Sequence, residues 1–236
     1  MKLLTDANAK TVKGEKFGIY TTILYLAPSR ESGVINTCKF ADSCASVCLY
    51  KSGRGNMPSV IKSRVRKTVE FAHNPKLFIE NLASDIEEAQ VVSNNKGLKL
   101  AIRLNGTSDL PLESLGGFLK VNLMERFPSV IFYDYTKNPF RAELFAQGKM
   151  PKNYHLTFSR SATNLDNCDE LIKLGVSIAT VFNVKKGASL PSYYKGYKVI
   201  DGDISDARFL DEKGVIIGLR AKGKAIHDKS GFVVNV

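Results

Sequence analysis

The sequence predicts an α/β protein built as an incomplete parallel (β/α) barrel of about six to seven strands, folded as a single domain over residues 1–236. Apolar runs rich in β-branched and aromatic residues alternate with helical patterns, which is typical of parallel α/β folds. Most runs are continuously apolar, as expected for strands buried on both faces. No linker or shift in composition divides the chain. An open doubly wound sheet is the alternative, but Ala27–Gly33 lacks the glycine pattern of a dinucleotide-binding turn.

The expected elements follow from local patterns. A helix over Lys76–Val92 begins after Asn74-Pro75, because an Asn N-cap followed by Pro is a favourable helix start. Similar starts predict helices over Phe140–Gln147, from Asn164 or Asp166 to Leu174, and after Asp109-Leu-Pro111. A further helix is expected to begin at Pro58. Its residues Ile61, Val65 and Val69 are expected to face inward and its basic residues outward. The seven expected strands are Ile19–Leu26, Leu98–Leu104, Val130–Tyr135, Tyr154–Ser159, Ser177–Phe182, Tyr197–Ile200 and Val215–Leu219.

The excess of basic residues indicates which binding partners the protein favours. The chain has 34 Lys and Arg against 23 Asp and Glu, a net charge of +11, which favours polyanions or phosphorylated small molecules. The excess is locally concentrated between Lys51 and Lys67. This segment is either a solvated helix face or a surface that contacts nucleic acid or phosphate. The candidate contacts are Arg54, Lys62, Arg64, Arg66 and Lys67.

The sequence shows neither a membrane span nor a signal peptide. No apolar run reaches the roughly 18 residues of a transmembrane helix. The first residues lack the apolar stretch of a secretory signal. We therefore expect a cytoplasmic protein with no membrane partner.

Polar residues collect where the expected strands end, and in parallel α/β folds this edge carries the chemistry. Any one of them also suits an ordinary cap or turn. Asp134 stands out because it lies in an apolar run, where an unpaired charge is unfavourable. The catalytic candidates are Asp134, Asp201 and Asp203, and the cofactor-binding candidates are Asn105, Ser108, Asp109, Ser159 and Asn183.

Three cysteines form the most specific pattern. Cys38, Cys44 and Cys48 are spaced C-x5-C-x3-C in a Cys-rich loop, residues 36–56, after the first long strand. Clustered thiolates select soft metals, and three ligands without a clear fourth suit a [4Fe–4S] cluster with one open iron. Zinc is the alternative, although zinc sites usually use a second pair of ligands. Small buried thiols without a metal would also explain the pattern.

Three cysteines after the first strand of a partial barrel resemble the layout of radical S-adenosylmethionine enzymes. Their usual spacing is C-x3-C-x2-C, so this resemblance covers the layout and not the motif. It implies an iron–sulfur enzyme that uses S-adenosylmethionine to modify a nucleotide, a nucleic acid or a peptide. Two alternatives remain: a zinc-stabilised barrel that binds nucleic acid or modifies bases, and a non-enzymatic accessory protein that binds another protein.

A second resemblance extends over almost the whole chain. The stretches are Asn36-Thr-Cys38, Cys44, Cys48-Leu49, Gly53-Arg54-Gly55, Arg103-Leu-Asn-Gly-Thr-Ser-Asp109, Phe132-Tyr-Asp-Tyr-Thr-Lys137, Leu156-Thr-Phe-Ser159, Val199-Ile-Asp-Gly-Asp203 and Gly231-Phe-Val-Val234. They resemble the bacteriophage gene-product eighty-eight family. The resemblance implies a phage or mobile-element origin without supplying a mechanism. A phage protein would lie in the cytoplasm of the host cell, and the non-enzymatic alternative would then be a phage accessory protein that binds a host protein.

Overall fold

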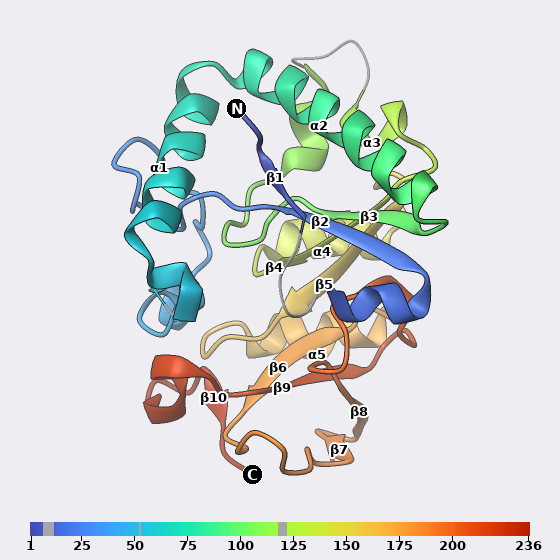
Figure 1. Cartoon of the computed structure of the whole chain (residues 1–236). Coiled ribbons are helices and arrows are strands. Elements are labelled where there is room, and N and C mark those ends of the chain that lie inside the picture. Colours follow the sequence, from blue (N-terminus) through green and yellow to red (C-terminus); the bar gives the residue numbers. More distant parts are fainter. Residues whose placement is uncertain (7–11, 52, 118–121) are drawn as a thin grey trace.

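A computed structural model describes residues 1–6, 12–51, 53–117 and 122–236 (Figure 1). The chain forms one mostly parallel sheet with helices packed against it, so the α/β class is confirmed. All seven expected strands are present. The strands are β1 (Leu4–Thr5), β2 (Ile19–Leu24), β3 (Lys99–Arg103), β4 (Ile131–Thr136), β5 (Tyr154–Ser159), β6 (Ile178–Phe182), β7 (Tyr193–Tyr194), β8 (Tyr197–Asp201), β9 (Ile216–Arg220) and β10 (Val233–Val234).

Among the described residues the sheet has 10 strands instead of six to seven, in the order β1-β2-β3-β4-β5-β6-β9-β8-β7, with β10 beside β6. The additional strands β1, β7 and β10 have two residues each, too few to show any periodicity in the sequence. The expected barrel is not confirmed, because the sheet is open. Within the described part of the chain, the edge strands β1 and β7 pair only with β2 and β8.

In the described ranges, five α-helices and seven short 3₁₀ helices connect the strands. Asn74 and Asn138 cap α2 and α4 as expected, because each side chain accepts a hydrogen bond from the first turn. The helices are α1 (Pro58–His73), α2 (Pro75–Asn95), α3 (Leu123–Arg126), α4 (Pro139–Ala146) and α5 (Leu165–Lys173), with η1 (Val12–Phe17), η2 (Asp42–Ala45), η3 (Leu49–Lys51), η4 (Gly53–Asn56), η5 (Leu112–Gly117), η6 (Arg208–Leu210) and η7 (Gly223–His227).

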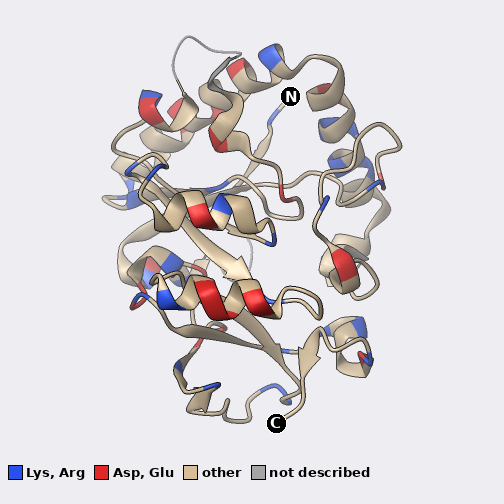
Figure 2. Ribbon diagram, turned by 180° about the vertical axis from the view of Figure 1, so that it is seen from behind, with Lys and Arg blue, Asp and Glu red and all other residues tan. Residues whose placement is uncertain are grey.

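One face of the sheet is covered by helices, and its apolar side chains form the main core. Phe78 and Leu82 of α2 pack against Ile102 and Phe132 of the sheet. Farther along the sheet, the apolar side of α5 packs against β5 and β6. Figure 2 shows α4 and α5 in front of the sheet when the molecule is seen from behind. The strands from β2 to β6 thus follow one another in chain order under helices on a single face.

The strand order reverses beyond β6, and this reversal sends one connection to the opposite face. β9 lies between β6 and β8 although it follows β8 in the chain. A right-handed connection from β8 back to β9 must cross the face that the helices leave open. Accordingly Phe209 of this connection packs edge-on against Tyr133, at 5.5 Å between ring centroids, in a cluster with Ile19 and Ala101.

None of the helices in the described ranges combines the length and the apolarity needed to cross a bilayer.

Candidate functional site

The Cys-rich loop lies along the carboxyl edge of the sheet, beside α1 (Figure 1). Its middle part reaches the loop after β5, where the Thr163 hydroxyl donates to the Asp42 carboxylate at 2.7 Å. Val47 packs against Ala221 and Val233 near the ends of β9 and β10. The loop therefore extends over the ends of several parallel strands, which is where an α/β protein binds its ligands.

The three cysteines of this loop are partly buried, and none of them forms a disulfide. The Cys38 sulfur lies 3.8 Å from the Thr107 carbonyl oxygen and 3.8 Å from the Thr37 hydroxyl. Burial raises the pKa of the Cys38 and Cys44 thiols, and the negative charge of a Cys48 thiolate adds to both shifts. The three thiols therefore lie within electrostatic reach of one another, with Cys48 coupled to both others.

The thiols do not yet converge on a single point. Among the described residues, no three Cys, His, Asp or Glu side chains are placed to hold a metal ion. The loop carries only short 3₁₀ turns, which are η2, η3 and η4. A metal would therefore have to draw the thiolates together, and metal binding by Cys38, Cys44 and Cys48 stays a prediction.

A partly buried lysine, Lys137, lies within electrostatic reach of Cys44. The Lys137 ammonium donates to the Arg160 carbonyl at 3.1 Å and more weakly to the Ser159 carbonyl at 3.4 Å, and it stands 5.0 Å from the centre of the Phe232 ring. Burial lowers the pKa of Lys137, and the Cys44 thiolate is the largest influence in the opposite direction. No carboxylate in the described part of the chain lies within ion-pair distance of this ammonium.

A buried arginine lies beside Cys48. The Arg64 guanidinium stands between the rings of Tyr25 and Tyr50, at 5.0 and 5.2 Å from their centres, and donates to the Tyr50 carbonyl at 3.3 Å. Its Nε is buried without an acceptor. Burial lowers the pKa of Arg64, and Cys48 is among the groups that act against this shift. Among the described residues this guanidinium also has no carboxylate partner.

The predicted outward orientation of the basic helix is wrong in part. Arg64 and Lys67 face inward and are only 9% and 6% exposed, whereas Ile61, Val65 and Val69 are only partly buried. Lys67 donates to the Leu3 carbonyl and so fastens the N-terminal strand. Three of the predicted contacts remain on the surface, namely Arg54, Lys62 and Arg66.

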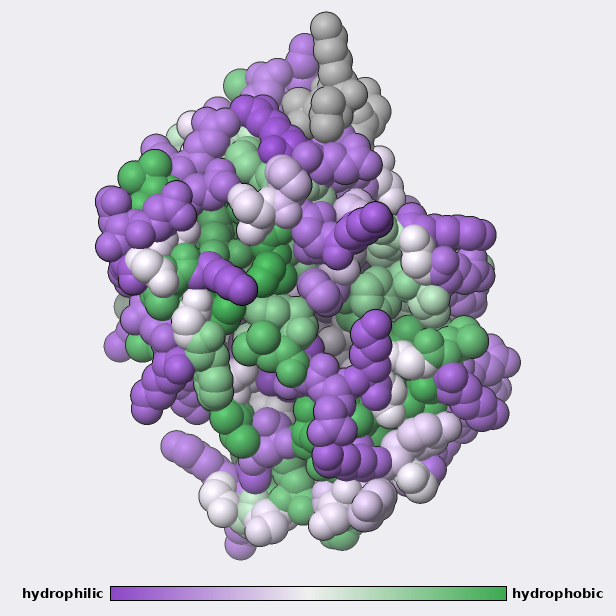
Figure 3. Space-filling model, turned by 90° about the vertical axis from the view of Figure 1, so that its right-hand side faces the viewer, coloured by the Kyte–Doolittle hydropathy of each residue, from purple (hydrophilic) through white to green (hydrophobic). Residues whose placement is uncertain are grey.

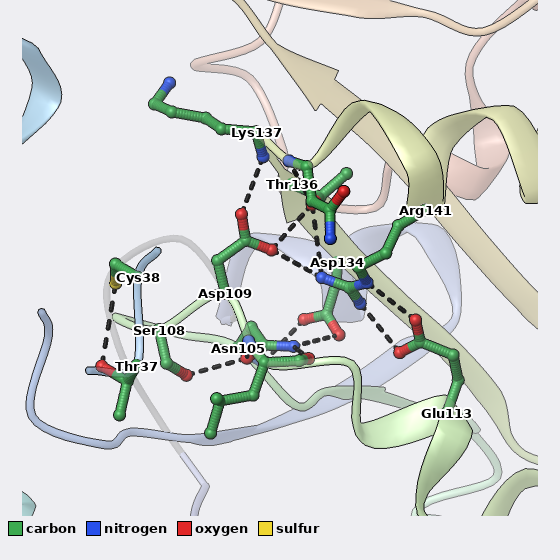
Figure 4. A network of polar contacts seen from close by, with 12 residues as sticks. Thr37, Cys38, Asn105, Ser108, Asp109, Glu113, Asp134, Thr136, Lys137 and Arg141 are labelled. Atoms are coloured by element: carbon green, nitrogen blue, oxygen red, sulfur yellow. Dashed lines mark hydrogen bonds and ion pairs between the residues drawn. The ribbon is translucent and has the colours of Figure 1, made fainter. Parts of the chain in front are cut away.

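The loop after β3 brings four of the predicted site residues together (Figure 4). The buried Asp134 carboxylate accepts the backbone N–H of Asn105 at 2.7 Å and its side-chain amide at 3.0 Å. The side-chain oxygen of Asn105, Oδ1, in turn accepts the Ser108 hydroxyl at 2.8 Å and the Leu110 N–H at 2.9 Å. Burial raises the pKa of Asp134 to about 6. Asp134 and Asn105 thus fold the backbone that lies against Cys38.

Asp109 connects this loop to three further residues. Its carboxylate accepts the Thr136 hydroxyl at 2.7 Å, the Lys137 backbone N–H at 2.8 Å and the Arg141 guanidinium at 2.5 Å. Arg141 also forms a two-pronged ion pair with Glu113, at 2.7 and 2.8 Å. The same guanidinium donates to the Tyr154 hydroxyl, which donates to Asp134. Two loops and two strands are joined in a single buried network.

The remaining predicted site residues lie elsewhere. Arg220 binds both Asp201 and Asp203, at 2.9 and 3.2 Å, and Lys222 binds Asp203 at 2.6 Å. These ion pairs lie at the ends of β8 and β9. Asn183 contacts Asn235 near β10 through its side-chain amide at 3.0 Å. Ser159 contributes its backbone carbonyl to Lys137. The structure therefore separates Asp201, Asp203 and Asn183 from Asp134 and its partners.

Sequence reasoning missed several residues that complete the network. Lys137 directly follows a strand end and could have been found by the rule that selected Asp134. Arg141 lies one turn after the Asn138 cap and gave no such signal, because it resembles any charged helix residue. Glu113 likewise gave no signal in the sequence. The residues added by the structure are Glu113, Thr136, Lys137, Arg141 and Tyr154.

A cavity near α3 and the start of β5 touches this network only through Glu113. Its walls include Met124, Leu144 and Asn153, and none of the predicted site residues. Figure 3 shows the amino edge of the sheet, opposite the Cys-rich loop, where apolar and polar side chains are interspersed.

The fold and the site define a class: an open, mostly parallel α/β protein whose carboxyl edge combines a three-cysteine loop with a buried ion network. The particular family follows from comparison with known proteins. A model of the Gene product 88 family matches residues 2–236, so the chain belongs to that family and the resemblance seen in the sequence is confirmed. No curated protein and no solved structure matches the chain.

Proposed function

We propose that this protein is a phage or mobile-element iron–sulfur enzyme, similar in layout to radical S-adenosylmethionine enzymes, that modifies a nucleotide, a nucleic acid or a peptide. Cys38, Cys44 and Cys48 would hold a [4Fe–4S] cluster through three irons. The cluster, when bound, supplies the electron that starts radical chemistry on S-adenosylmethionine. Three thiolates leave one iron open for that cofactor.

The observation that carries this proposal is a pair of cations, the partly buried Lys137 and the buried Arg64, within electrostatic reach of the cysteines. Cys44 influences the pKa of Lys137 and Cys48 that of Arg64, and neither cation has a carboxylate within ion-pair distance among the described residues. A cation that is withdrawn from water without a counter-charge is unfavourable. Thiolates bound to a metal carry net negative charge. The two cations therefore suit an anionic metal–thiolate group on the Cys-rich loop.

The residues around the cysteines fit such a group in a second respect. Asp109 lies near enough to Cys38 and Cys44 for its charge to raise the pKa of both thiols. Its carboxylate is held by Thr136, Lys137 and Arg141, and is therefore fixed in orientation. In this proposal Asp109 orients the cofactor bound at the open iron. Asn105 and Ser108 support it by shaping the loop.

The zinc alternative keeps the same three ligands but assigns the function to a nucleic-acid surface. That surface is smaller than the sequence suggested, because Arg64 and Lys67 are buried. Arg54, Lys62 and Arg66 remain exposed beside the loop. We retain them as contacts for a nucleic-acid or nucleotide substrate. Four unpaired cysteines agree with a reducing cytoplasm.

The experiment is anaerobic purification and reconstitution with iron and sulfide. We expect about four irons per chain and broad absorption near roughly 400 nm that changes when S-adenosylmethionine is added. Cys44→Ser should lose the cluster, whereas Cys168→Ser, which alters a buried thiol of α5, should keep it. One tightly held zinc without colour would favour the zinc alternative. Equal iron content in both variants would refute the proposal.

A further inference from the structure

The face of the sheet opposite the helices carries a second buried polar cluster, which is separate from the cysteines. The Asp206 carboxylate, on the connection from β8 to β9, accepts the Arg103 guanidinium at 3.1 Å and the Tyr133 hydroxyl at 3.1 Å. The Tyr135 hydroxyl donates to it at 3.4 Å. The Arg103 guanidinium also stacks over the Tyr135 ring at 4.6 Å. One guanidinium and two phenols thus converge on a single anionic group.

The cluster contains more hydrogen-bond donors than acceptors. Arg208, whose side chain is only 4% exposed, lies beside Tyr135 and gives one hydrogen bond to the Ser205 carbonyl at 2.7 Å. Its Nη1 forms an ion pair with Asp211 Oδ2 at 3.2 Å, but the two atoms are not aligned for a hydrogen bond, so this carboxylate oxygen is also buried without a hydrogen-bond partner. The Nε atoms of both Arg103 and Arg208 are buried without an acceptor. Buried donors without acceptors are rare in native proteins and unfavourable by about 1–3 kcal/mol each.

We infer that Arg103, Arg208, Tyr133 and Tyr135 form a binding site for a phosphoryl group, and that the Asp206 carboxylate occupies this site in the structure described here. A phosphoryl group offers more terminal oxygens than a carboxylate and has the geometry that a guanidinium binds with two N–H groups. It would supply acceptors to the donors that Asp206 leaves unpaired. The ligand is therefore a phosphorylated molecule.

The position of the cluster agrees with a role in substrate binding. Arg103 is the last residue of β3, two residues before Asn105, so the cluster is close to the carboxyl edge that the Cys-rich loop covers. The identification of this phosphorylated ligand as the substrate rests on the proposed function. Of the substrates considered, nucleotides and nucleic acids carry phosphates by their chemistry.

Access requires the segment around Asp206 to move aside, and its structure permits this. Residues 203–211 form no strand pairing, and the only helix in this segment is the three-residue η6. Ile204 and Leu210 expose most of their side chains within it. Residues 205–208 are buried, but the backbone N–H groups of the segment bond within local turns, as in the bond from Leu210 to the Ala207 carbonyl at 3.1 Å. Segments held by local turns open at lower free energy than sheet cores.

The test uses inorganic phosphate and the full chain without metal, with affinity measured by calorimetry. Asp206→Asn keeps the size of the side chain and removes the competing charge, so it should bind phosphate at least about tenfold more tightly than the unmodified chain. Adding Arg103→Met or Arg208→Met to Asp206→Asn should abolish that gain. Arg126→Met, at an exposed ion pair far from the cluster, is the matched control and should not change binding.

Three results would overturn the inference: no phosphate binding by folded Asp206→Asn, binding that ignores both arginine substitutions, or equal binding of acetate. If Asp206→Asn does not fold, hydrogen exchange on the unmodified chain decides. Phosphate should then increase the rate of amide hydrogen exchange in residues 203–211. The inference would be overturned if these amides were as protected as those of β4, both with and without phosphate. Because no arm needs the cysteines, this outcome is independent of the iron–sulfur proposal.

Discussion

Asp109 donates its backbone N–H to the carbonyl oxygen of Thr37 at 2.8 Å, and this bond attaches the loop after β3 to the start of the Cys-rich loop. The Asp109 carboxylate is at the same time clamped by Arg141. The position of Cys38, directly after Thr37, therefore depends on a buried ion network that belongs to α4 and η5.

Substitution of Arg141 tests that dependence. Arg141→Met leaves Glu113 and Asp109 without their buried counter-charge, so we expect a loss of about 3–5 kcal/mol in the free energy of unfolding. It should also speed alkylation of Cys38, resolved by mass spectrometry. Arg126→Met breaks an exposed pair with Glu87, and we expect a loss below about 1 kcal/mol. Similar losses in the two variants, measured by chemical denaturation, would contradict the network.

The two cations beside the cysteines lead to a second prediction. Arg64→Gln should weaken metal retention by about 10- to 100-fold, the usual effect of removing a residue that supports metal ligands. Arg66→Gln is the matched control, since Arg66 lies on the same helix and faces solvent. Retention is measured by competition with a chelator. A loss of the same size in both variants would show that only the overall positive charge matters.

Asp134 makes stability depend on pH. Its pKa is raised from the ordinary 3.8 to about 6, mainly by burial, so the folded state favours the protonated form. The stabilisation is complete below the unfolded pKa and is lost as pH rises through 6. The difference corresponds to about 2 kcal/mol between pH 4 and pH 7. Asp134→Asn should reduce this decline by that amount in denaturation series across the range, and an unchanged decline would refute the assignment.

Gly106 is required by close packing. A Cβ atom at this position would stand 2.6 Å from Ile23 Cγ2 and 2.6 Å from the Tyr25 ring. Because neither group is free to move in the core, Gly106→Ala should destabilise the fold by about 1–3 kcal/mol. It should also displace Tyr25 and thereby loosen Arg64. Thermal denaturation measures the first effect, and an unchanged melting temperature would contradict the packing.

Local chemistry made the strands and caps predictable. The apolar runs gave all seven longer strands, and the Asn-Pro pairs gave the starts of α2 and α4. The order of the strands across the sheet was not predictable. Nothing in the residues of β9 indicates that this strand inserts between β6 and β8. This is why an unclosed sheet with a reversal replaced the expected barrel.

The part of the site whose residues lie on neighbouring strands was predictable from the sequence. Asn105 and Asp109 follow β3, and Asp134 lies in the second half of β4. Because β3 and β4 are adjacent and parallel, these residues come close together. Asp201 and Asp203 also follow a strand, but β9 separates that strand from β6. The inward side of α1 was misjudged because Arg64 stacks its guanidinium between two tyrosine rings, and hydrophobic periodicity does not detect such stacking.

The place of β9 between two strands that precede it also fixes the order in which the chain can assemble. During synthesis, β2 to β6 can pair one after another, but one edge of β6 stays open until residues 216–220 have emerged. That edge belongs to the apolar run Ile178–Phe182, and an unpaired apolar edge is prone to associate with other chains. The C-terminal fifth of the sequence thus completes the sheet and ends its most aggregation-prone stage.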